Sequence, residues 1–135
     1  MQNTLSDIKI SLPFKGYDLD IDDKTQLSSG KTAFEEWIED NCDKALALLQ
    51  NWGVDVTTAD SRKLKRAEIQ LLTAYAIEHL EFQDTVDPQS LSSAGESRSF
   101  KKLSAEDRGK KVATIKDNVY FTLFGKYAEN SDGIV

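Results

Sequence analysis

Cysteine, histidine, proline and glycine are all scarce in this chain of 135 residues, which contains one cysteine, one histidine, two prolines and seven glycines. A single cysteine, Cys42, excludes an internal disulfide and is typical of a protein made in a reducing compartment. One thiol and one imidazole, that of His79, supply too few nitrogen and sulfur ligands for a zinc site. We therefore expect no cofactor and no resident metal.

Catalytic motifs are missing as well. Cys42 and His79 both fall on predicted helices, where they could face each other, but a nucleophilic pair also needs an orienting group and an oxyanion site, and no local motif indicates either. Gly95 is isolated and matches no phosphate-binding loop. Carboxylates one helical turn apart, such as Glu35 and Glu39, lie on a face that we expect to be solvated rather than in a cleft. The sequence favours a protein that is not an enzyme.

Long apolar runs are the third absence. No segment approaches the ~20 apolar residues that a membrane-spanning helix needs. The first ten residues, MQNTLSDIKI, lack the basic start and apolar core of a signal peptide. We expect a protein without membrane contact that is made in the cytoplasm.

The composition that remains is that of one globular domain, with 39% apolar and 30% charged residues. The net charge of −6 disfavours binding of nucleic acid over the whole surface. This charge is uneven, because residues 17–60 hold eleven acidic residues and only three lysines. The region is either a solvated acidic surface or one that repels a polyanion or meets a basic partner.

Apolar residues recur at helical spacing in three stretches, which predict helices at about 32–52, 61–82 and 104–124. The middle stretch has no glycine or proline, can be capped by Asp60 or Ser61, and has a wide apolar stripe. We expect it to be the central helix, covered by the other two. Its short connection to the first helix indicates that these two pack antiparallel.

The ends of the other two helices are also marked in the sequence. Thr32 and Glu35 have the spacing of a capping box, and so do Ser104 and Asp107. Gly53 and Gly125 follow the last apolar residues, where a left-handed C-cap is needed. These signals predict an all-α fold, a small bundle of three main helices within a single domain spanning residues 1–135.

Four segments lie outside the three helices. Residues 4–14 suit either a helix capped by Thr4 or a strand, and we favour a short helix that ends before Pro13. Residues 15–31 form an acidic linker, whose alternating aspartates lack the glycine and the distant glutamate of a calcium loop, so we expect a solvated loop. Residues 83–103 predict a long, partly extended, protruding loop, and residues 128–135 a polar tail.

Several motifs, taken in their order, resemble the head–tail connector (adaptor, or head-completion) proteins of tailed bacteriophages and prophages. The matching stretches are Leu12-Pro13-Phe14, Trp52-Gly53 at the end of a helix, Leu71–Leu80 as an alanine-rich helix closing in His-Leu, Ser92–Phe100, and Leu123–Tyr127. The resemblance extends over roughly residues 8–127. The chain departs from the family in its glycine-poor middle loop and its unusually acidic 17–31 segment.

The resemblance implies a structural protein of the virion neck, at the head–tail interface, assembled in the cytoplasm of the bacterial host. It implies a ring of this chain, about twelve copies, beneath the portal protein. Such a ring joins the portal to stopper or tail-completion proteins and extends the channel through which DNA passes without specific recognition. A closed ring also requires each copy to present two different surfaces to its neighbours. The acidic region could line the channel.

The long loop, the basic start of the central helix and the end of the last helix are the expected contact regions, because a structureless loop of that length is usually functional. The residues expected to contact partners or other copies are Arg98, Ser99, Phe100, Lys101, Lys102, Lys63, Arg66, Phe124, Lys126 and Tyr127. For Lys63 and Arg66, the sequence leaves open whether the acidic contact lies within or between copies.

Two other functions are compatible with the sequence. The chain could be a small cytosolic module that binds another protein. It could also bind nucleic acid weakly through residues 98–111, where six basic residues surround Phe100, although Glu96, Glu106 and Asp107 dilute that charge.

Overall fold

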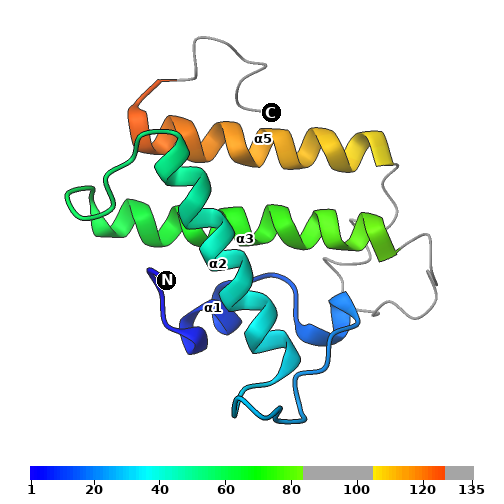
Figure 1. Ribbon diagram of the computed structural model, residues 1–135. Coiled ribbons are helices and arrows are strands. Elements are labelled where there is room, and N and C mark those ends of the chain that lie inside the picture. Colours follow the sequence, from blue (N-terminus) through cyan, green and yellow to red (C-terminus); the bar gives the residue numbers. More distant parts are fainter. Residues whose placement is uncertain (84–104, 127–135) are drawn as a thin grey trace.

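The computed structural model describes residues 1–83 and 105–126, and within these ranges every regular element is helical (Figure 1). The elements are α1 (Leu5–Ser11), the short 3₁₀ helix η1 (Gly16–Leu19), α2 (Ala33–Asn51), α3 (Ser61–Gln83) and α5 (Ala105–Phe124). The predicted all-α fold, with three main helices and a short N-terminal one, is confirmed. The central helix continues to Gln83, the residue at which we had expected the loop to begin.

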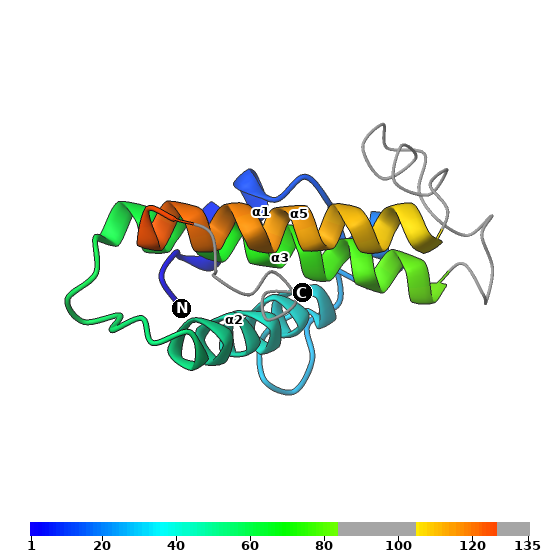
Figure 2. The same ribbon diagram turned by 90° about the horizontal axis from the view of Figure 1, so that it is seen from above.

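Helices α3 and α5 lie side by side and antiparallel in both views (Figures 1 and 2). α3 is the centre of the fold, since it makes the most extensive contacts with α5, α2 and η1. Between Leu64 and Leu80 its buried apolar residues include both branched and small side chains: Leu64, Ala67, Leu71, Leu72, Ala74, Tyr75, Ala76, Ile77 and Leu80. The alanines let neighbouring helices approach closely, which explains why one helix is covered on more than one side.

Helix α2 crosses α3 steeply, so the predicted antiparallel packing of these two helices is wrong (Figure 1). The buried stripe of α2 runs from Phe34 through Ile38 and Cys42 to Leu49. Crossing angles follow from how side-chain ridges fit into grooves, and a short connection does not fix them. The antiparallel partner of α3 is α5, whose link to it is much longer.

The predicted helix ends agree with the structure where it describes them. The Thr32 Oγ1 accepts a hydrogen bond from the Glu35 N–H at 3.2 Å, and the Glu35 carboxylate accepts one from the Thr32 N–H at 2.9 Å. Asp60 caps α3, because its Oδ1 accepts the N–H groups of Arg62 and Lys63 at 2.8 and 3.3 Å. Gly53 follows α2 with φ +91°, a left-handed conformation that glycine adopts without strain.

The start of the chain is a helix rather than a strand. The Thr4 Oγ1 accepts from the Asp7 N–H at 3.1 Å, and the backbone becomes extended at Leu12, just before Pro13. Ile8 and Leu12 are buried, whereas Ile10 is 76% exposed. A strand would have placed Ile8 and Ile10 on one face, so the burial pattern itself distinguishes the two alternatives.

Residues 15–31 are only partly the solvated linker that we expected. Gly16, Asp18 and Leu19 of η1 are buried, and η1 contacts α3. The Asp18 carboxylate accepts the Lys15 N–H at 2.8 Å, so a carboxylate that we expected in solvent caps a buried turn. A Cβ on Gly16 would lie 2.6 Å from the Ile21 carbonyl oxygen, which leaves no room for any other residue. Residues 24–30 are exposed, as predicted.

Candidate functional site

The first two turns of α3 carry four exposed cations, Arg62, Lys63, Lys65 and Arg66, which we call the basic surface. They lie on the side of the helix opposite the buried Leu64 and Ala67. No member of the basic surface forms an ion pair with another described residue. The sequence left the acidic contact of Lys63 and Arg66 open, and the described residues contain none within the chain.

This position is electrostatically unfavourable for a cation. The start of a helix carries partial positive charge, and the first turn of α3 contains no acidic residue. Arg62 and Arg66 are also one turn apart, where like charges repel. Asp60 precedes the helix, and its carboxylate is engaged with backbone N–H groups. The basic surface therefore opposes the stability of the helix that carries it, which favours a role outside the folded chain.

Much of the acidic region has partners inside the chain. The Lys9 ammonium lies 2.9 Å from the Asp23 carboxylate and 3.1 Å from that of Glu35. Partial burial alone would lower the pKa of Lys9, but the hydrogen bonds that its ammonium donates to these two carboxylates, together with their negative charge, outweigh burial and raise the pKa. Lys31 pairs with Glu39 at 2.6 Å. These acids connect α1 and the 20–31 segment to α2, so they contribute to folding.

Three acids on the outer face of α2 form a separate group, Glu36, Asp40 and Asp43, which we call the acidic stripe. They are spaced four and three residues apart, so they follow one side of the helix over about 10 Å. Asp40 and Asp43 are exposed and have no ion pair with a described residue. Glu36 is partly buried and accepts a hydrogen bond from the Ser29 hydroxyl at 2.9 Å.

Glu78 connects the three long helices. Its carboxylate on α3 lies 3.8 Å from the Lys44 ammonium of α2 and 3.5 Å from the Lys116 ammonium of α5. The Lys44 ammonium also lies 4.3 Å from the centre of the Tyr75 ring, within the range of a cation–π contact. Burial, with a smaller contribution from the Glu78 charge, raises the pKa of Tyr75 to about 12. The surfaces on α2 and α3 are thus held on one body.

His79 and Cys42 contact different groups, so the pair that we considered from the sequence is not built. The His79 Nε2 lies 2.9 Å from the Leu19 carbonyl oxygen, which only accepts, so this nitrogen donates its hydrogen. The His79 ring also meets Trp37 edge-on, with centroids 6.2 Å apart. Cys42 is buried, and burial together with the nearby Glu68 charge raises the pKa of its thiol to about 12. A thiol in that state is a poor nucleophile.

Glu68 is a buried functional group that the sequence analysis missed. Its carboxylate, in a residue only 3% exposed, accepts hydrogen bonds from the N–H groups of Gln2 and Asn3 at 2.8 and 2.9 Å. The Asn3 side-chain amide donates to it as well, at 3.0 Å. These contacts tie the first residues to α3 and explain a buried charge on the central helix. The only signal in the sequence was a Glu at an otherwise apolar position.

The end of α5 is partly an internal contact. The Phe124 ring lies 4.4 Å from the Tyr120 ring, which meets Trp52 edge-on at 5.2 Å. Phe124, expected to contact a partner, thus contributes to an aromatic cluster that joins the ends of α2 and α5. Lys126 is exposed beyond Gly125, which has φ +72° as predicted for a C-cap.

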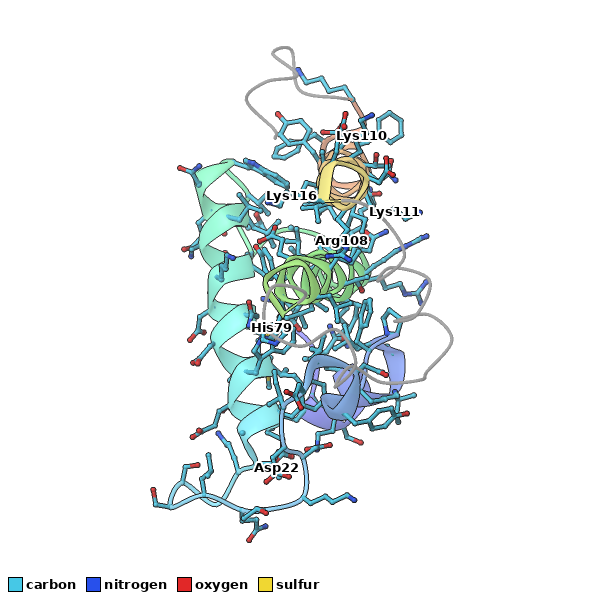
Figure 3. All side chains as sticks on the ribbon, turned by 90° about the vertical axis from the view of Figure 1, so that its right-hand side faces the viewer. Asp22, His79, Arg108, Lys110, Lys111 and Lys116 are labelled. Atoms are coloured by element: carbon cyan, nitrogen blue, oxygen red, sulfur yellow. The ribbon has the colours of Figure 1, made fainter. Side chains whose placement is uncertain are left out.

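The start of α5 offers fewer cations than the sequence indicated. Arg108 is only 3% exposed, so it is withdrawn from any surface contact with phosphates. Lys110 is exposed and lies 3.4 Å from Glu106 on the same helix, and Lys111 is exposed. Viewed along the α3–α5 pair, Lys110 lies near one extreme of the molecule and Asp22 near the other (Figure 3). Because Arg108 is buried, the predicted nucleic-acid contact loses one of its six basic residues.

Several expected contact residues lie outside the described residues: Arg98, Ser99, Phe100, Lys101, Lys102 and Tyr127. The predicted loop from residue 84 onward, Ser104 and the 128–135 tail lie outside them too. α3 ends and α5 begins at the same end of the antiparallel pair, so both attachment points of the 84–104 segment lie there (Figure 1).

The part of the chain that the structure describes has neither a metal-binding group nor a membrane-spanning helix. Among residues 1–83 and 105–126, no group of three or more His, Cys, Asp or Glu side chains is arranged to hold a metal ion. None of the helices in these ranges has the length and apolar character to cross a membrane. Comparison of the chain with protein-family models, curated proteins and solved structures gave no match in any of the three.

Proposed function

We propose that this protein is a structural adaptor that forms a ring in the neck of a tailed phage, where it joins the portal to the stopper or tail proteins and extends the DNA channel. The role is structural and involves no catalysis. The ring places the chain at the head–tail interface of the virion, after assembly in the cytoplasm of the host.

The arrangement of the resembling motifs supports this proposal. The Trp52-Gly53 pair stands at the end of α2, the alanine-rich Leu71–Leu80 stretch forms the buried middle of α3, and Leu123-Phe124-Gly125 ends α5. Leu12 and Phe14 are buried on either side of Pro13. The motifs thus lie at helix ends and in the buried core. Their order along the chain therefore follows the arrangement of the whole domain.

The observation that carries the proposal is the pair of charged surfaces whose members form no ion pair with another described residue. A ring needs a heterologous contact, in which one copy presents a surface that its neighbour complements with a different one. The basic surface on α3 and the acidic stripe on α2 are two such surfaces, of opposite sign and on a common rigid body. Four cations at a helix start disfavour the helix, and a contact with an acidic surface would offset that cost.

Co-assembly with the portal protein of the same phage tests the proposal. We expect the purified chain to form a ring on portal particles, visible by electron microscopy, with a copy number near that of the portal subunits. A chain that stays monomeric or dimeric and ignores the portal would overturn the proposal and favour the cytosolic interaction module.

Deletion of residues 88–102 sharpens the test. The contacts that α3 makes with α2, α5 and η1 are formed by residues outside this segment, so we expect a retained helical circular-dichroism spectrum and loss of assembly onto portals. A deletion variant that still assembles would remove the segment from the contact. Salt-sensitive binding of duplex DNA by the wild-type chain, without portal binding, would favour the nucleic-acid hypothesis instead.

A further inference from the structure

We infer that the basic surface on the start of α3 docks on the acidic stripe of α2 in a second copy of the same chain. This inference deepens the ring proposal and rests on it for the expectation that copies of the chain associate. It adds the partner and the residues: Arg62, Lys63, Lys65 and Arg66 of one copy, and Glu36, Asp40 and Asp43 of the next.

The two surfaces are not available to each other within one chain. α2 crosses α3 so that its first half, which carries the acidic stripe, points away from the 52–60 connection, whereas the basic surface begins directly after that connection (Figures 1 and 2). No ion pair joins the two groups. Buried side chains of α2 and α3 pack in one core that holds the crossing, and the ionic contacts of Glu78 with α2 and α5 add to this packing. Only a second molecule can bring the surfaces together.

Charge complementarity identifies that second molecule. Each surface repeats like charges at three- and four-residue spacing, which destabilises an isolated helix. The basic surface extends along about 6 Å of α3 and the acidic stripe along about 10 Å of α2, so the stripe is long enough to accommodate the basic surface. Several cations elsewhere differ from the basic surface, because carboxylates inside the chain pair with Lys9, Lys31 and Lys116. Every copy of the chain carries the acidic stripe, so this anionic partner is always present at the same concentration as the basic surface.

Nucleic acid fits the basic surface less well. The acidic 17–60 region lies on the same body as the basic surface, so a polyanion that extends beyond the basic surface meets like charge. A second copy, in contrast, presents the acidic stripe. Docking of the two surfaces offsets the like-charge repulsion within the basic surface and within the acidic stripe.

Reversal and complementation of charge test the inference. One variant carries glutamate at all four positions of the basic surface, and a second carries Glu36→Lys, Asp40→Lys and Asp43→Lys. Mass is followed by light scattering at about 20 mM and about 500 mM salt, since the Debye length falls from ~20 Å to a few Å over that range. We expect the wild-type chain to associate at low salt and to fall towards its monomer mass of 15.1 kDa at high salt.

Each reversed variant alone should remain at the monomer mass, because both of its surfaces then carry the same sign. A mixture of the two should regain the wild-type mass, since every contact is again between opposite charges. Lys110→Glu and Glu106→Lys, two exposed positions on α5, are matched controls that should leave association unchanged. Helical circular dichroism checks folding, and the milder pair Asp40→Asn and Asp43→Asn replaces the second variant if it does not fold.

The possible failures are distinguishable. Variants that are folded but do not regain mass on mixing would overturn the docking contact, even if the wild-type chain forms a ring on portals. A wild-type chain that is monomeric at low salt would overturn it too, as would loss of duplex DNA binding as the sole effect of reversing the basic surface. Restored mass that corresponds to a closed dimer would keep the contact and overturn the ring.

Discussion

The two parts of α3 contrast sharply. From Ala67 to Leu80 nearly every residue is buried or partly buried, and the side chains contact α2, α5 and η1. From Ser61 to Arg66 only Leu64 is buried, and four cations at the positive end of the helix dipole form no ion pair with another residue that the structure describes. The first part determines the fold. The second weakens the helix that carries it, an arrangement that the proposed contact outside the chain would explain.

The largest effect that separates the two parts should come from Leu71→Ala. Leu71 is fully buried in the middle of α3, so the change removes buried apolar groups and leaves a cavity. We expect a loss of about 2–5 kcal/mol in the free energy of unfolding. Denaturant unfolding measures it. Lys65→Ala, in the basic surface, is the control and should change stability by less than about 0.5 kcal/mol. Equal losses for the two variants would contradict the contrast.

Glu68→Ala should have the next largest effect. It removes the acceptor of three hydrogen bonds and leaves the Gln2 and Asn3 N–H groups without it, so we expect a loss of about 1–3 kcal/mol. Glu68→Gln keeps one acceptor oxygen and should lose less. Glu106→Ala, at a carboxylate 79% exposed, serves as the control with little change expected. If Glu68→Ala unfolds like the control, the carboxylate does not hold the first residues.

Acid should reveal a smaller contribution at the start of α2. The hydrogen bond from the Thr32 N–H, and then the Lys9 ammonium, lower the pKa of Glu35 below its ordinary value of 4.5. A lowered folded-state pKa means that the stabilisation is complete above about 4.5 and is lost as the pH falls through the lower, folded-state value. Thermal unfolding of wild type and Glu35→Gln between pH 7 and pH 3 measures it. We expect the difference between them to shrink at the acid end; a constant difference would refute the assignment.

The smallest effect has the opposite sign. Lys63→Glu places a carboxylate where the helix dipole favours one, so we expect the chain to gain about 0.3–1 kcal/mol in stability. Lys63→Gln, which only removes the positive charge, should gain less. A loss of stability in both variants would mean that Lys63 contributes to the fold after all.

Features that depend on local patterns could be predicted from the sequence. The spacing of apolar residues located the three long helices that the structure describes, Thr32 and Glu35 marked the start of α2, and Pro13 marked the end of α1. These features follow from backbone hydrogen bonding and side-chain periodicity over a few residues.

Contacts between residues far apart in sequence could not be predicted. Glu68 contacts Gln2 across 66 positions, and His79 contacts Leu19 across 60, so no local pattern contains either. The burial of Asp18 depends on η1 packing against α3, and the steep crossing of α2 depends on side-chain ridges. Of the expected contact residues, Lys63 and Arg66 are exposed and have no ion pair within residues 1–83 and 105–126, whereas Phe124 packs within the chain.

One sample tests most directly the claim that the start of α3 serves contact rather than folding. The chain with glutamate at Arg62, Lys63, Lys65 and Arg66 is measured both for its melting temperature, by circular dichroism, and for its mass at low salt, by light scattering. Docking through the basic surface predicts an equal or higher melting temperature together with loss of association. A lower melting temperature with association retained would contradict it.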